Sequence, residues 1–85
     1  MKKGTSKREA LKILQAVANA IMAGKAKAEE NGGYALTELA RHAEVKTKAL
    51  LKAMRIWFDQ KIARFNNKLV HLPRGPNQLQ RYVDA

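Results

Sequence analysis

Two amphipathic segments separated by a three-residue break constrain the fold of this 85-residue chain more than any other feature. Apolar and small residues recur at helical spacing in residues 37–43 and again in residues 47–61, which predicts two helices joined by a tight turn at residues 44–46. A threonine stands at the start of each segment. Because a threonine hydroxyl can accept a hydrogen bond from a free amide in the first helical turn, we expect Thr37 and Thr47 to cap these helices.

A longer amphipathic segment precedes this pair. Ser6 and Glu9 have the spacing of a capping box, in which both side chains accept hydrogen bonds from backbone amides at the start of a helix. The apolar residues that follow fall on one side of a helical wheel: Ala10, Leu11, Leu14, Val17, Ala18, Ile21 and Met22. We expect this helix to end near Asn31, before a pair of glycines, and an end at Gly24 is the alternative.

Residues 62–72 change to a period of two. If Phe65 pairs with Val70, the apolar side chains share one face of a half-buried β-hairpin, and Arg64 and His71 share the other. The predicted apolar face consists of Ala63, Phe65, Val70 and Leu72. The turn lies within residues 66–69, where two asparagines tolerate the positive φ that short hairpins demand. Residues 34–36 could form one further short strand.

The size of the chain allows one small domain with one core, since 46% of the residues are hydrophobic and 28% are charged. We assign residues 1–5 to a basic flexible arm, residues 6–72 to the folded domain and residues 73–85 to a C-terminal tail. Helical turns within the tail would place Leu79, Tyr82 and Val83 at packing spacing. A domain of this size is marginally stable alone, so the sequence leaves both a monomer and a homodimer as alternatives.

A strong positive charge indicates a polyanionic partner. The chain has 17 Lys and Arg residues against 7 Asp and Glu residues, a formal net charge of +10. A basic surface that only favours solubility is the alternative. Cysteine is absent, which excludes a disulfide framework. No apolar run approaches the roughly 20 residues that span a bilayer, so we expect a cytoplasmic or nucleoid-associated protein that does not bind a membrane.

Residues 6–72 give a predicted order of a helix, a candidate short strand, a helix, a turn, a helix and a hairpin. This order resembles the winged helix-turn-helix superfamily of DNA-binding domains. Leu39 and Ala40 match the apolar and small positions of its first motif helix, and Leu50 and Met54 match inward positions of its second. The resemblance implies a mostly α fold of three helices with a small β-hairpin as a C-terminal wing. Glu44 departs from it, because many such sequences have a left-handed glycine there. A glutamate in that conformation costs about 1 kcal/mol, so we expect a wider turn.

The second helix of the pair carries a row of cations. If its apolar residues point inward, steps of about 100° per residue place Lys48, Lys52 and Arg55 together on the outward side, where they can donate to phosphate oxygens and guanine acceptors. The resemblance also implies contacts from the wing. The predicted DNA-binding residues are therefore Lys46, Thr47, Lys48, Lys52, Arg55, Arg64 and Lys68. A solvated helix face is the alternative.

Ile56 projects near these cations and fits the predicted core poorly. It could touch a thymine methyl group, pack under the hairpin or belong to a protein interface. We expect no enzyme activity, no cofactor and no metal site, because the acidic residues are scattered and His42 and His71 are far apart in sequence.

The leading hypothesis is a double-stranded DNA-binding protein that acts as a transcriptional regulator or as an accessory factor in replication or recombination. The first alternative is a protein-interaction module that binds an acidic partner through the first helix or the Ile56 side. The second is an RNA-binding protein, which shares the charge argument.

Overall fold

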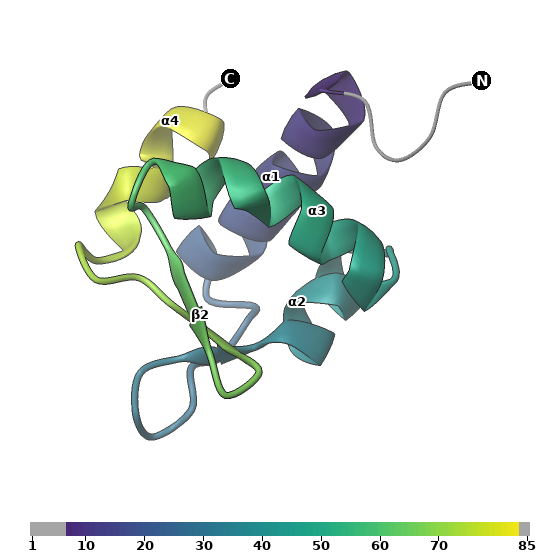
Figure 1. Ribbon diagram of the computed structural model, residues 1–85. Coiled ribbons are helices and arrows are strands. Elements are labelled where there is room, and N and C mark those ends of the chain that lie inside the picture. Colours follow the sequence, from purple (N-terminus) through teal and green to yellow (C-terminus); the bar gives the residue numbers. More distant parts are fainter. Residues whose placement is uncertain (1–6, 84–85) are drawn as a thin grey trace.

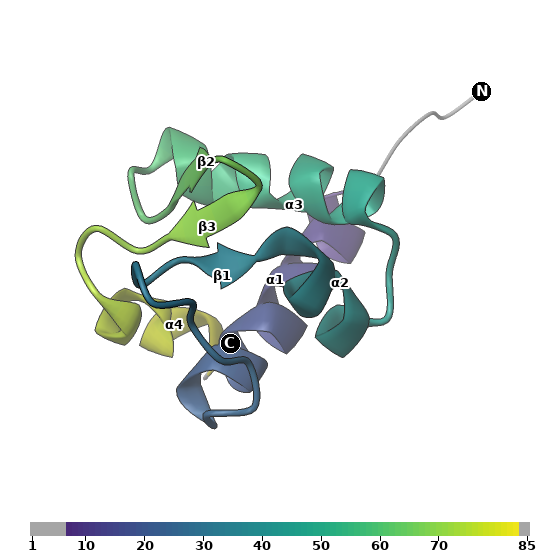
Figure 2. The same cartoon turned by 90° about the horizontal axis from the view of Figure 1, so that it is seen from below.

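The computed structural model describes residues 7–83, which form a mostly helical chain with one small sheet (Figures 1 and 2). The predicted arm at residues 1–5 and the predicted cap Ser6 lie outside the described residues. In chain order the elements are α1 (Lys7–Met22), β1 (Tyr34–Ala35), α2 (Leu36–Ala43), α3 (Thr47–Asp59), β2 (Arg64–Asn66), β3 (Leu69–His71), the 3-10 helix η1 (Pro76–Leu79) and α4 (Gln80–Val83).

Helix α1 is the central element of the fold, because it packs against α2, α3 and α4 (Figure 1). Helices α1, α2 and α3 each bury side chains at the spacing of three and four that the sequence predicts. The largest fully buried side chains come from several elements: Trp57, Leu14, Leu39, Leu50, Met54, Leu79, Val17 and Val70. Leu11 is an exception, since it was predicted to face the core and is 41% exposed. It lies at the edge of the α1 stripe, where it lines an open groove with Tyr82 of α4.

Helix α1 ends at Met22, so the prediction that it continues to Asn31 is wrong and the alternative end near Gly24 is right. Gly24 adopts a φ of 78°, and the amides of Lys25 and Ala26 donate to the carbonyl of Ala20 at 2.8 and 3.1 Å. These bonds close the last turn of the helix. The good helix formers that follow did not outweigh this glycine, because Ala26 turns back and is buried against the core.

Neither threonine caps its helix, so this prediction is also wrong. The residue before α2 is Ala35 and the residue before α3 is Lys46, and neither makes a side-chain capping bond. Thr37 and Thr47 lie inside the first turns instead. The start of α2 is held by tertiary structure, because the amide of Leu36 donates to the carbonyl of Lys68 in the hairpin at 3.2 Å. Helix α3 ends at Asp59, two residues before the predicted end.

The turn between α2 and α3 is tight, and the expectation of a wider turn is wrong. Glu44 takes the left-handed conformation, with φ 59° and ψ 41°. Its amide donates to the carbonyl of Arg41 at 3.1 Å, and the amide of Val45 donates to the carbonyl of Ala40 at 3.0 Å. These two bonds satisfy the last carbonyls of α2 and hold Glu44 in a conformation that its Cβ disfavours.

Glu44→Gly is therefore expected to stabilise the protein by about 0.5–1 kcal/mol, because glycine adopts this conformation without the clash of a Cβ. For a domain of this size the midpoint of thermal unfolding should rise by roughly 2–8 °C, as measured by circular dichroism. Glu44→Ala is the matched control, since it removes the same charge and keeps the Cβ. If both variants raise the midpoint of thermal unfolding equally, loss of the charge rather than relief of backbone strain is the cause.

The hairpin has the predicted register, with Phe65 paired to Val70. Asn66 pairs with Leu69, so the two loop residues are Asn67 and Lys68, whose φ values are 54° and 64°. Positive φ values at both central residues are characteristic of a type I′ turn. The expected third strand is also present: β1 pairs antiparallel with β3, which places β3 in the middle and leaves β2 as an edge of the sheet.

The two faces of the hairpin differ from the prediction in their burial. Phe65 was expected to be covered and is 41% exposed, because no further strand lies outside β2. His71 was expected to be exposed and is half-buried. Gly33 packs against it so closely that a Cβ on Gly33 would lie 2.7 Å from His71 Cε1 and 2.9 Å from Leu69 Cβ. The loop that follows α1 thus covers the predicted polar face.

The C-terminal segment contributes to the core. Leu79 in η1 is fully buried and Tyr82 in α4 is 9% exposed, and both elements pack on α1. The ring of Tyr82 meets Trp57 edge-on at a centroid distance of 5.3 Å, and its hydroxyl donates to Gln60 Oε1 at 3.5 Å. The helical turns that the spacing of Leu79, Tyr82 and Val83 suggested are therefore present, and the core extends beyond residue 72.

Candidate nucleic-acid interface

The outward face of α3 carries the predicted cations. Lys48, Lys52 and Arg55 are exposed at helical spacing, whereas the opposite side of α3 is buried through Leu50, Ala53, Met54 and Trp57. Figure 1 shows α3 crossing in front of α1, so this face points away from the centre of the molecule. Asp59, four residues after Arg55, is exposed on the same side and places a negative charge at the C-terminal end of the row.

These cations have no carboxylate partner within residues 7–83. The ion pairs found there involve Glu38, and the side chains of Lys48, Lys52 and Arg55 take part in none of them. An ammonium or guanidinium group without a protein partner can donate all of its hydrogen bonds to a ligand. We use the name α3 cation row for Lys48, Lys52 and Arg55.

The hairpin lies along one flank of α3, as Figure 2 shows. The rings of Phe58 and Phe65 stack at a centroid distance of 6.3 Å and an interplanar angle of 26°. Nearer the start of α3, Thr47 and Lys68 line one cavity. The structure therefore brings the predicted residues Thr47 and Lys68 together, although 20 other residues separate them in sequence.

That cavity has a volume of about 380 Å³ and lies where α2 and α3 both begin. Thr37 also lines it, a residue that the sequence indicated only as a cap. Neither helix start has a side-chain cap, although the amide of Leu36 donates to the backbone carbonyl of Lys68. The N-terminal ends of both helices carry the positive ends of their dipoles. Together with the Lys68 ammonium group, this end of the interface favours a negatively charged group such as phosphate.

Lys46 and Arg64 lie at other places on this part of the molecule. Lys46 is exposed directly before α3, at the turn. Arg64 is exposed and pairs with His71 at the far end of the hairpin from Lys68. Since neighbouring residues of a strand point to opposite faces, Arg64 points to the face away from Phe65. The structure does not bring Arg64 to the cavity of Lys68.

Two acidic residues mark the end of the positively charged surface beside the hairpin turn. Glu29 and Glu30 line a cavity together with Asn67 and Leu69. The loop that carries them is held by Asn31, whose Oδ1 accepts a hydrogen bond from the amide of Gly33 at 3.0 Å. No local pattern could reveal this neighbourhood, because the loop and the hairpin are far apart in sequence. A polyanion that contacts Lys68 is repelled from the side of Glu29 and Glu30.

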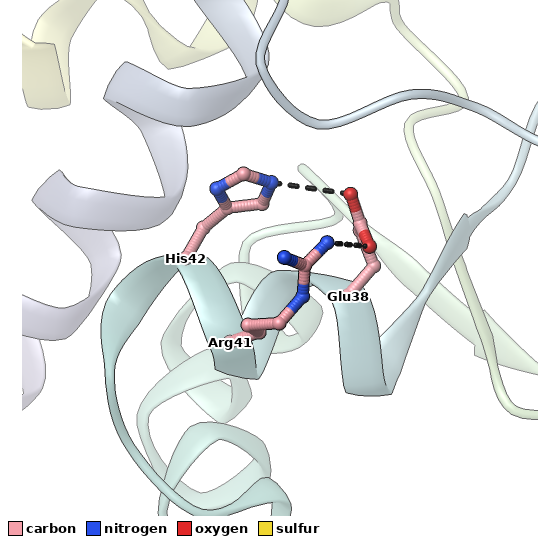
Figure 3. Close-up of polar contacts among 3 residues, drawn as sticks. All are labelled: Glu38, Arg41 and His42. Atoms are coloured by element: carbon pink, nitrogen blue, oxygen red, sulfur yellow. Dashed lines mark hydrogen bonds and ion pairs between the residues drawn. The ribbon is translucent and has the colours of Figure 1, made fainter.

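A carboxylate in α2 contacts the side chains of Arg41 and His42 (Figure 3). Arg41 donates to Glu38 Oε1 at 2.7 Å, and His42 Nε2 lies 3.1 Å from Glu38 Oε2. The hydrogen bond from Arg41, followed by that from His42, holds the pKa of Glu38 below its ordinary value. Arg41 thus has a local partner, which distinguishes it from the α3 cation row.

Ile56 is half-buried and packs against the core. Helical spacing places it on the same flank of α3 as Ala49, which lines a groove with Lys12 and Ile13 of α1. The hairpin lies on the other flank, beside Thr47 and Phe58. Helical spacing therefore favours packing of Ile56 on the α1 side of α3 rather than under the hairpin.

Residues 7–83 contain no group of three histidine, aspartate or glutamate side chains placed to hold a metal ion. No helix in the same range is both long and apolar enough to cross a membrane. Comparison of the chain with protein-family models, with curated proteins and with solved structures found no match.

Proposed function

We propose that this chain is a winged helix-turn-helix protein that binds double-stranded DNA, with α3 as the recognition helix and the β2–β3 hairpin as the wing. The observation that carries the proposal is the α3 cation row, three exposed and unpaired cations opposite a fully buried face. The element order and the sheet order β1-β3-β2, with the hairpin beside α3, support the superfamily assignment.

The dimensions of α3 suit the major groove. Its 13 residues span about 20 Å, and an α-helix fits a groove about 12 Å wide. Lys48 and Arg55 lie seven residues apart, which is about 10 Å along the helix. Side chains at this spacing can donate to phosphates and to the O6 and N7 acceptors of guanine. Phosphate contacts then position the helix, and base contacts supply any sequence preference.

The end of the interface near Lys68 supplies backbone contacts. The cavity that Thr37, Thr47 and Lys68 line lies at the N-terminal ends of α2 and α3. A phosphate there accepts hydrogen bonds from hydroxyl and amide donors and gains from the helix dipoles. In this arrangement the protein acts as a transcriptional regulator or as an accessory factor in replication or recombination, since both require a bound duplex.

Duplex affinity should fall steeply with salt. Lys46, Lys48, Lys52, Arg55 and Lys68 offer about five phosphate contacts, so a plot of log affinity against log salt should have a slope near −4.5. Fluorescence anisotropy with a labelled duplex measures this slope. A slope near zero, or no binding at low salt, contradicts the proposal. Double-stranded RNA should compete weakly, because side chains cannot read its deep and narrow major groove.

A second candidate function, binding of an acidic protein, is favoured by one groove between α1 and α4. Leu11 is exposed there beside Tyr82, and three cations surround them: Lys7, Arg8 and Lys12. An acidic amphipathic helix could place apolar side chains on Leu11 and its carboxylates on the cations. Titration with such a synthetic helix would test it. Equal binding by the wild type and by Leu11→Asp removes this candidate.

A further inference from the structure

Phe65 is a large aromatic side chain that the fold leaves open. It is 41% exposed. Within residues 7–83, Leu11 is the other large apolar residue that is exposed, and to the same extent. One side of its ring stacks on Phe58, which is half-buried on α3. Strand β2 is an edge of the sheet, so no neighbouring strand covers the rest of the ring. The pair therefore presents an aromatic surface to solvent.

This surface lies on the same side of the molecule as the α3 cation row. Arg55 precedes Phe58 by three residues, so the two side chains are neighbours on the helix surface. Lys61, another exposed cation, stands in the connection from α3 to β2. Phe65 shares its sheet face with Val70, which is fully buried. Because Phe58 covers the side of the ring that faces α3, the open part of the ring lies toward the free edge of β2, in the neighbourhood of Arg55 and Lys61.

We propose that Phe65 is a stacking site for an unpaired nucleobase, and that the protein prefers duplex DNA that carries a single-stranded tail. The inference rests on the proposed function, because the ligand is again a nucleic acid. Both faces of a base in an intact duplex are covered by its neighbours, so an aromatic ring can stack only on a base that has left the stack. Arg55 and Lys61 are placed to contact the phosphates of that unpaired strand.

Stacking accounts for the exposed ring better than a contact with paired DNA. An aliphatic side chain would contact a thymine methyl group equally well, whereas the face of an aromatic ring matches the face of a base. Stacking of this kind is tolerant of sequence, because every base has an aromatic face. The tail therefore needs no particular sequence, and the cations hold its backbone.

The test compares a blunt duplex with the same duplex extended by a single-stranded thymidine tail. Fluorescence anisotropy should show tighter binding of the tailed duplex by wild-type protein. Phe65→Leu keeps an apolar side chain and removes the aromatic face, so it should weaken binding of the tailed duplex about tenfold and leave the blunt duplex unchanged. Phe65→Tyr, which keeps the aromatic face, should retain the preference for the tail.

A second measurement needs no variant. A 2-aminopurine base placed in the tail should lose fluorescence when wild-type protein binds, because stacking quenches it. If the tail gives neither quenching nor tighter binding while the blunt duplex still binds, this inference fails and the proposed function stands. If the blunt duplex does not bind and the tailed probe binds and is quenched, the proposed function fails and the stacking site stands. Equal weakening of both probes by Phe65→Leu also overturns the inference.

Discussion

Replacement of Lys48, Lys52 and Arg55 together by alanine is expected to abolish measurable binding to duplex DNA at physiological salt. Each of these side chains can supply a charge-assisted hydrogen bond to phosphate or guanine, and removal of all three should cost on the order of 4 kcal/mol, or about a thousandfold in affinity. The salt slope should also become shallower by about 2.7, since about three phosphate contacts are lost. Anisotropy titrations at several salt concentrations measure both effects.

The fold should survive this change, because all three side chains are exposed and make no ion pair within residues 7–83. The far-ultraviolet circular dichroism of the triple variant should match that of the wild type. A matched control replaces three exposed cations elsewhere, Lys25, Lys27 and Arg81, and changes the net charge equally. If the control loses as much affinity, binding depends on total charge rather than on the α3 cation row. Loss of helical signal in the triple variant would contradict the orientation of α3.

Leu79→Ala is expected to lower the free energy of unfolding by about 3 kcal/mol, as is typical when a buried leucine is truncated. Leu79 is fully buried where η1 packs on α1. For a small domain whose total stability is about 5–10 kcal/mol, this loss should lower the midpoint of thermal unfolding by roughly 10–20 °C. Trp57 is the only tryptophan and is fully buried against Tyr82, so its fluorescence can follow urea unfolding.

Asn77→Ala is the matched control for this prediction, because Asn77 is exposed in the same 3-10 helix. It should change the unfolding free energy by less than about 0.5 kcal/mol. If Leu79→Ala is as stable as this control, the C-terminal segment is not part of the cooperative core. A similar loss in both variants would indicate that the 3-10 helix matters through its backbone rather than through the burial of Leu79.

Local periodicity predicted much of the architecture correctly. The helices at residues 36–43 and 47–59 and the register of Phe65 with Val70 follow from apolar spacing, because burial on one face requires a period near 3.6 in a helix and of two in a strand. The exposure of Lys48, Lys52 and Arg55 follows for the same reason. Once one side of an amphipathic helix is buried, its other side must face solvent.

The errors in local structure occur where two signals compete. Gly24 ended α1 although good helix formers follow it, and Glu44 took a left-handed conformation that its own preference opposes. Thr37 and Thr47 are residues that favour caps, yet the backbone bond from Leu36 to Lys68 fixed where α2 begins. Single-residue preferences are worth about 1 kcal/mol, so packing and long-range hydrogen bonds can override them.

The sequence by itself determined the elements, the hairpin register and the side of α3 on which cations are exposed, because each depends on residues within a few positions of one another. Only the tertiary structure decided which distant residues meet: Lys68 with Thr47, the acidic loop with the hairpin turn, and Leu79 with α1. It also left Phe65 open at the edge of the sheet and covered His71. The physical reason is that burial depends on what the rest of the chain places over a residue, which local spacing does not contain.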